Sequence, residues 1–181
     1  MTNKEKAILD MIAYAEGTLG VSQNGYDIAF DHRIIVGWIP ETTMKHGGLL
    51  WKEQLRGEGK RLSTVGGRYQ FKQETWVEVV GDIPFNKNNQ DIGALKLLNS
   101  VIKMTIREKK SVNIETMSNK NEFIILLNKI ASTWASIPYE YNGFKSYYKY
   151  TDDKGEKVPQ PSKSVDELYT IYNKALDLYG G

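Results

Sequence analysis

One carboxylate stands where a helical pattern gives way to glycine, in the run Ala13-Tyr14-Ala15-Glu16-Gly17-Thr18. The negative end of a helix dipole and partial burial both disfavour the charged form of Glu16, so both raise its pKa. A general acid that works near neutral pH needs such a raised pKa. By itself the pattern is more typical of a solvated helix-end glutamate, because most glutamates are exposed.

A second candidate for chemistry is the run Gly66-Gly67-Arg68-Tyr69-Gln70-Phe71. Its two glycines permit close approach of the backbone. Arg68, Tyr69 and Gln70 combine flat stacking surfaces with hydrogen-bonding groups, which suits a cleft that holds a sugar. A turn followed by a core-packed Tyr69 and Phe71 explains the same run equally well.

The third candidate is the tyrosine-rich segment that follows residues 131–138. Trp134 falls on the apolar face of a predicted helix, so we expect it in the core. Tyr139 and Tyr141 follow Pro138, which ends that helix, and are better placed to line a cleft. The chain has 11 tyrosines, whose rings suit carbohydrate but also occur at the rims of cores.

Composition excludes several other kinds of site. The 181 residues include no cysteine and two histidines, which removes disulfides, cysteine nucleophiles and multi-histidine metal sites. No P-loop, G-x-S-x-G or H-E-x-x-H motif occurs, and we expect no cofactor and no metal. The net charge of +2 predicts no nucleic-acid partner. No apolar run reaches membrane-spanning length and no secretory signal is visible, so we expect synthesis in a cytoplasm without stable membrane insertion.

Helical periodicity covers most of the chain. The Thr2–Glu5 capping box predicts a helix that ends at Glu16-Gly17, and a second box at Ser164–Glu167 begins the last helix. Further helices are predicted from residue 73 to a stop at Gly81, over 91–109 and over 123–134. The residues expected to face inward are Ile8, Met11, Ile12, Ala15, Trp76, Val79, Val80, Ile92, Leu95, Leu98, Ile102, Ile106, Phe123, Leu126, Leu127, Ile130, Val165, Leu168, Tyr172, Ala175 and Leu176.

Two stretches depart from the helical pattern. Residues 20–66 are rich in glycine, and apolar residues alternate between Tyr26 and Trp38, which predicts a small β-hairpin lobe. Residues 150–163 are polar, contain two prolines and read as a loop. The predicted fold class is therefore α+β: a single domain over 1–181, with a mainly helical body and a β-containing lobe over about 20–66.

Five segments, in this order and spacing, resemble the family of the bacteriophage lambda endolysin. The matching segments are 9–18 (LDMIAYAEGT), 24–27 (NGYD), 67–70 (GRYQ), 89–91 (NQD) and 134–138 (WASIP). Each is weak alone, but five in order outweigh the blander interpretations of Glu16 and of residues 67–70. The resemblance covers roughly residues 5–180 and implies a lysozyme-like fold with a substrate cleft beside the β-hairpin lobe. The range 150–163 would be a polar insertion loop.

The resemblance also implies roles for particular residues. The family's catalytic acid falls on Glu16, and its Gly-Arg-Tyr-Gln segment places Arg68, Tyr69 and Gln70 at the cleft. Tyr26 is a further substrate-binding residue by the same reasoning. The family's cleft tyrosine after the Trp-Ala-Ser-x-Pro segment corresponds to Tyr141, with Tyr139 as the alternative.

The implied activity is that of a peptidoglycan lytic transglycosylase. Protonated Glu16 would cleave the bond between N-acetylmuramic acid and N-acetylglucosamine. As a carboxylate it would then take the proton of the muramic C6 hydroxyl, giving a 1,6-anhydro product. A hydrolytic muramidase on the same fold is the alternative, with Asp27 or Asp31 as second carboxylate. We favour a structural role for Asp27, bonded to backbone N–H groups of its loop.

The biological setting is likewise implied by the family. The partner is the peptidoglycan glycan strand, and we expect a monomer. A phage endolysin without a signal would gather in the host cytoplasm and act in the periplasm after a holin opens the inner membrane. A virion-associated enzyme, or a non-catalytic virion protein that binds cell wall, is the alternative.

Overall fold

The computed structural model describes residues 1–29, 33–35, 37–46, 64–104, 111–139, 149–151, 156–159 and 162–180. The chain divides into two compact units. Unit 1 comprises Met1–Ala15 with Leu98–Gly181, and unit 2 comprises Glu16–Leu97. The expectation of a single domain over 1–181 stays a prediction.

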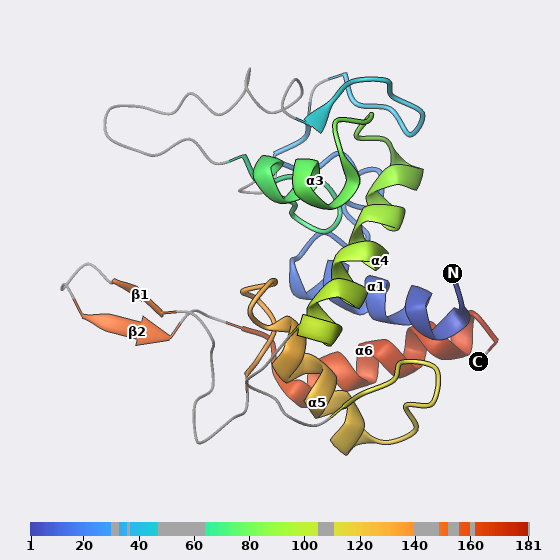
Figure 1. Ribbon diagram of the computed structural model, residues 1–181, viewed down its shortest axis with the longest axis vertical. Helices are drawn as coiled ribbons and strands as arrows, with labels where there is room; N and C mark the ends of the chain where they lie inside the picture. The colour runs from blue at the N-terminus through green and yellow to red at the C-terminus, as the bar shows by residue number, and fades with distance from the viewer. Residues whose placement is uncertain are drawn as a thin grey trace. The chain divides into compact units, whose positions relative to one another are not determined.

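Unit 1 is built from helices at both ends of the chain. Helix α1 (Asn3–Ala15) packs against α6 (Val165–Leu178), which also contacts α5 (Lys120–Ile130) (Figure 1). Side-chain hydrogen bonds join α1 to the segment of residues 165–179. The Tyr14 hydroxyl donates to Glu167 at 2.7 Å, and the Tyr179 hydroxyl donates to Asp10 at 2.6 Å. The predicted inward residues of these three helices are buried, apart from the half-buried Leu176.

Both predicted capping boxes are confirmed. At the start of α1, Glu5 N donates to Thr2 Oγ1 at 3.2 Å and Thr2 N donates to Glu5 Oε2 at 2.8 Å. At the start of α6, Glu167 N donates to Ser164 Oγ at 3.1 Å. These bonds satisfy N–H groups that the first helical turn leaves without a partner. The helix boundaries were therefore readable from sequence at these two positions.

Helix α4 (Lys87–Met104) differs from its predicted form. It begins four residues earlier than expected, where Asn86 Oδ1 accepts a hydrogen bond from Asn89 N at 2.9 Å. The prediction that Ile92 faces inward is wrong, because its side chain is 42% exposed. Gln90 is buried instead, on the same side of the helix as Ala94 and Leu98. A buried glutamine is possible there because its amide finds hydrogen-bond partners.

The core of unit 2 is aromatic. Helix α3 (Gln73–Val80) ends at Gly81, as predicted, and buries Trp76. The Trp76 ring packs edge-on against Phe71 and Phe85, with ring centroids 5.3 and 4.8 Å apart. His46 stands edge-on to Phe85 at 4.4 Å, and its Nε2 is 2.9 Å from the Phe71 carbonyl oxygen. This cluster supports the loops that carry the candidate site.

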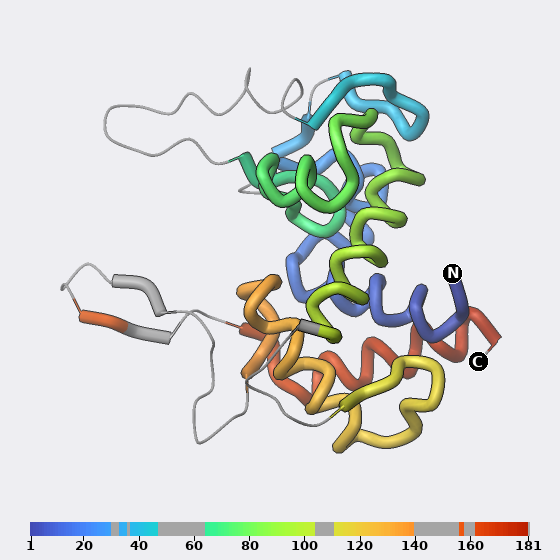
Figure 2. The backbone as a smooth tube through the Cα atoms, viewed as in Figure 1, coloured from blue at the N-terminus to red at the C-terminus, as the bar shows by residue number. Residues whose placement is uncertain are grey.

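The predicted β-hairpin over Tyr26–Trp38 is not confirmed. In the described part of residues 20–66, pairing is limited to isolated bridges such as Ile28–Ile34 and Ala29–Gly66. The backbone of residues 20–25, just before that stretch, turns repeatedly, with positive φ at Gly20, Ser22, Asn24 and Gly25 (Figure 2). Within the stretch, Gly37 has φ +79°, which interrupts the extended conformation that a strand requires.

Strands appear where the sequence predicted a polar loop. Strand β1 (Lys149–Thr151) pairs antiparallel with β2 (Lys157–Pro159), and Tyr150 lies opposite Val158. The strands are three residues each, too short to give an alternation signal against the charged residues around them. Residues 149–151 and 157–159 therefore form a small two-stranded ribbon where the loop was expected.

Candidate active site

Glu16 is the first residue after α1 and is half-buried. Gly17 follows with φ +73°, a conformation that glycine adopts without steric cost and that ends the helix. The next residue, Thr18, is fully buried. The predicted placement of Glu16 at a helix end is confirmed. Its role as catalytic acid and its raised pKa stay predictions.

Arg68 lies inside unit 2 against two tyrosine rings. Its guanidinium carbon is 5.1 Å from the centroid of Tyr26 and 5.9 Å from that of Tyr69. Arg68 Nη1 donates to the Asn24 carbonyl at 2.5 Å, and the residue is 2% exposed. Cation–π contacts of a desolvated guanidinium are among the stronger ones. Arg68 therefore joins the loop of residues 24–26 to that of residues 67–70.

Tyr26 and Tyr69 share one acceptor. Each hydroxyl donates to Asp91 Oδ1 at 2.7 Å, and both residues are buried. Burial, followed by the negative charge of Asp91, raises the pKa of both tyrosines well above 10. The hydroxyls thus remain donors at any physiological pH. Sequence reasoning placed Asp91 in a matching segment but gave it no role, because only the fold brings it to both tyrosines.

Gln70 holds a strained backbone position at the end of the same loop. Its φ is +50°, uncommon for a residue with a side chain. Its Nε2 donates to the carbonyls of Gly67 at 2.9 Å and Ile28 at 3.3 Å. Strain of this kind persists only where the surroundings fix the chain, and it occurs often at functional sites. Gln70 is half-buried, unlike Arg68 and Tyr69.

The structure confirms the interpretation of Asp27 as a loop-supporting residue. The residue is 3% exposed, and its carboxylate accepts from Ser22 Oγ at 2.5 Å and Gln23 N at 3.1 Å. Both carboxylate oxygens are therefore engaged within the turn of residues 22–27. Asp31, the other carboxylate considered, lies outside the described residues.

The tyrosines after Pro138 are described only in part. Tyr139 belongs to unit 1 and is 7% exposed, while Tyr141 lies outside the described residues. Trp134 is buried, as predicted. The assignments of Tyr26, Arg68, Tyr69, Gln70, Tyr139 and Tyr141 as substrate-binding residues stay predictions. The high burial of Arg68 and Tyr69 favours a supporting role for their side chains.

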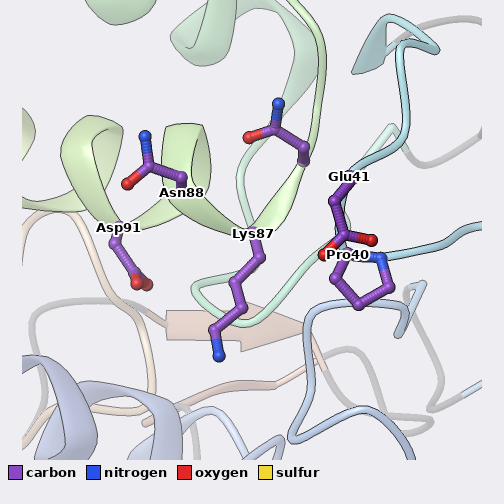
Figure 3. A pocket seen from close by; sticks show the side chains of 6 residues that line it. Pro40, Glu41, Lys87, Asn88 and Asp91 are labelled. Carbon is purple, nitrogen blue, oxygen red and sulfur yellow. The ribbon is translucent and has the colours of Figure 1, made fainter.

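A polar pocket of about 320 Å³ opens at the start of α4. Figure 3 shows Lys87 and Asp91, one helical turn apart, extending to the same side of the helix. Lys87 Nζ also stands 5.4 Å from the Tyr26 ring centroid. The lining residues are Pro40, Glu41, Asn86, Lys87, Asn88 and Asp91. Within the part of the chain that the structure describes, no cluster of three or more histidine, aspartate or glutamate side chains could hold a metal.

The sequence model of the Endolysin family matches residues 6–177. The chain belongs to the endolysin family. The family assignment identifies the chain as a lysozyme-like bacteriophage enzyme that degrades peptidoglycan during host lysis. Comparison with curated proteins finds no match. Among the helices that the structure describes, none combines the length and apolar character needed to cross a membrane.

Two solved structures match the endolysin over nearly its whole length. One is the lysozyme of bacteriophage lambda complexed with a chitohexasaccharide, at 21% identity and a TM-score of 0.61. The other is lysozyme from bacteriophage lambda, at 20% identity and a TM-score of 0.60. Each match covers 97% of this chain and 95% of the other. The likeness confirms the predicted lysozyme-like fold for this endolysin.

Proposed function

We propose that the chain is a peptidoglycan lytic transglycosylase in which one carboxylate, Glu16, carries both proton transfers. The observation that carries this proposal is the state of Asp27. That carboxylate is buried and already holds its own turn through two hydrogen bonds. A nucleophile or water-activating base needs a carboxylate that can reach the sugar or a water. Glu16, half-buried at the end of α1, fits such access better.

The reaction follows from one carboxyl group acting twice. Protonated Glu16 donates its proton to the oxygen that links N-acetylmuramic acid to N-acetylglucosamine, and the bond from that oxygen to the muramic C1 breaks. Positive charge develops at C1, as in an oxocarbenium ion. Glu16, now a carboxylate, takes the proton of the muramic C6 hydroxyl while the C6 oxygen bonds to C1. The 1,6-anhydro sugar forms without consumption of water, and Glu16 is protonated again.

Substrate contacts in this proposal divide into two groups. Tyr26, Arg68 and Tyr69 are buried and hold the loops of unit 2 in shape. Gln70 is half-buried, and in the described residues its Oε1 accepts no hydrogen bond, which leaves that atom for a sugar hydroxyl. Tyr139 is buried to a similar degree, at 7% exposed, and is given no sugar contact in this proposal, while Tyr141 lies outside the described residues. The lambda lysozyme complex, which binds a chitohexasaccharide, supports a β-1,4-linked amino-sugar chain as substrate.

The setting of the enzyme is part of the same proposal. In this proposal the enzyme gathers in the host cytoplasm and reaches its substrate, the cell wall, from the periplasm after a holin opens the inner membrane. It works as a monomer. Attachment to the virion is the competing location, and fractionation of purified particles with an antibody against the chain separates the two.

The decisive experiment is mass spectrometry of the fragments released from purified Gram-negative peptidoglycan. We expect muropeptides one water lighter than lysozyme products, with no reducible muramic end. Glu16→Gln should fold and release none, while Glu74→Gln, an exposed carboxylate of α3 in the same unit, should match the wild type. Reducing muramic ends would refute the transglycosylase and favour a hydrolase. No release by a folded wild type would favour a wall-binding role.

A further inference from the structure

The segment Asn89-Gln90-Asp91 contains a buried amide with no part in the proposed reaction. Gln90 is 0% exposed, and its side chain bonds to three separate stretches of backbone. Its Oε1 accepts from Arg68 N at 3.0 Å, and its Nε2 donates to the carbonyls of Tyr26 at 3.0 Å and Phe85 at 3.2 Å. Both donors and the acceptor oxygen of the amide are thereby used.

The backbone of Arg68 connects Gln90 to a residue close to Glu16 in the chain. The Arg68 N–H is bound by Gln90, and the Arg68 carbonyl accepts from Thr18 Oγ1 at 2.5 Å. Thr18 is 0% exposed and lies two residues after Glu16, across Gly17. The side chains of Gln90 and Thr18 thus bind the N–H and the carbonyl of Arg68, respectively. Together they connect α4 to the turn that carries the candidate acid.

Two glycines let this relay form at close range. A Cβ on Gly67 would lie 2.3 Å from Gln90 Oε1, and a Cβ on Gly25 would lie 2.6 Å from the Thr18 carbonyl oxygen. Any larger residue at either position would push the relay apart. The relay is therefore packed from both sides as well as hydrogen-bonded through the amide of Gln90 and the hydroxyl of Thr18, and such a buried network is rigid.

We infer that Thr18 and Gln90 are positioning residues that hold Glu16 at the reacting bond through the backbone of Arg68. The inference rests on the proposed role of Glu16. A general acid must stand within hydrogen-bond reach of the oxygen that it protonates. Displacement by about 1 Å costs on the order of 100-fold in rate. Both positioning side chains are fully buried and do not touch the sugar. Each acts by fixing the position of Glu16.

The first test removes the Thr18 hydroxyl without changing the shape of the side chain. Thr18→Val should lower kcat on solubilised glycan strands by at least about tenfold with KM unchanged. Thr18→Ser, which keeps the hydroxyl, should stay within about twofold of the wild type. The free energy of unfolding is measured for both, so that kcat refers to folded enzyme. Wild-type kcat in Thr18→Val, or an equal loss in both variants, would overturn the inference.

The second test uses pH. In Gln90→Glu, a carboxylate still accepts from Arg68 N but cannot donate to the carbonyls of Tyr26 and Phe85. Protonation restores one donor, so the ratio of variant to wild-type kcat should rise as the pH falls. Gln73→Glu at the start of α3 should give a flat ratio. A flat ratio for Gln90→Glu would also refute the inference.

These outcomes separate the inference from the proposed function. If the wild type releases no anhydro product, or if Glu16→Gln remains active, the proposed function fails. If the wild type is active and Glu16→Gln is not, an unaffected Thr18→Val defeats only the positioning role.

Discussion

Gly67 offers the sharpest test of how tightly the loop of residues 67–70 is packed, because Gly20 provides a matched control. The two glycines share φ +77°, so alanine pays the same backbone strain at each, about 1–2 kcal/mol. They differ in surroundings. Nothing lies within 4 Å of a Cβ at Gly20, whereas a Cβ at Gly67 would meet Gln90 Oε1 at 2.3 Å and Phe85 Cζ at 2.5 Å.

Neither neighbour of Gly67 can retreat at low cost. Gln90 is tied to three backbone groups, and Phe85 is wedged against Trp76 and His46. Overpacking of a buried site costs about 1–3 kcal/mol. We therefore expect Gly67→Ala to lower the free energy of unfolding by about 2–5 kcal/mol and Gly20→Ala by about 1–2 kcal/mol.

Urea denaturation of both variants measures the difference. The midpoint should fall further for Gly67→Ala, with the denaturant slope unchanged if the unfolded states are alike. Equal losses in the two variants would refute the reasoning, because strain alone would then account for both. A smaller loss at Gly67 would show that Gln90 moves freely and would also weaken the inferred relay.

Three further predictions concern single side chains. Burial lowers the pKa of His46 from 6.5 to about 4, so the unfolded chain binds the proton first. The free energy of unfolding should then fall by about 1.4 kcal/mol per pH unit as the pH drops from 6.5 to about 4. In His46→Gln residue 46 cannot titrate, so its free energy of unfolding from urea titrations should diverge from that of the wild type over this pH range. Asp91→Leu leaves the hydroxyls of Tyr26 and Tyr69 without their acceptor and should lower the free energy of unfolding by about 2 kcal/mol. Asp91→Asn keeps an acceptor oxygen and should lower it by less than half of that amount. Similar losses for the two variants in thermal melts would contradict the shared-acceptor interpretation. Ser164→Ala removes the cap of α6 and should cost about 1 kcal/mol, and an unchanged melting temperature would show that the cap contributes nothing.

Sequence patterns predicted helices well because their signals are local. Capping boxes at Thr2 and Ser164 and the stop at Gly81 involve residues within one turn of each other. The same locality explains the error at Ile92. Hydropathy assigns an isoleucine to the core, and only the partners of Gln90, many residues away along the chain, make the glutamine the better buried group.

The candidate site was predictable in part for a related reason. Glu16 and the loop of residues 67–70 were identifiable because their neighbours in sequence form recognisable runs. Asp91 and Thr18 were not assigned roles, since their importance lies in contacts with tyrosine hydroxyls and with the Arg68 carbonyl. The tertiary fold creates those contacts, and no spacing along the chain encodes them. The hairpin between Tyr26 and Trp38 is not confirmed, and in its described residues the pairing is the single antiparallel bridge Ile28–Ile34.

The packing of α1 against α6 has a consequence for the order of synthesis. The ribosome makes α1 before α6, so the apolar face of α1, including Ile8 and Ile12, lacks its partner until α6 has been made. Unit 2 is contiguous in the chain, and the bonds from Thr18 to the Arg68 carbonyl and from Tyr26 to Asp91 join residues of that unit. A nascent chain stalled before Val165 would therefore present an uncovered apolar helix, the kind of surface that recruits chaperones and promotes aggregation. Synthesis of α6 supplies the surface on which α1 packs.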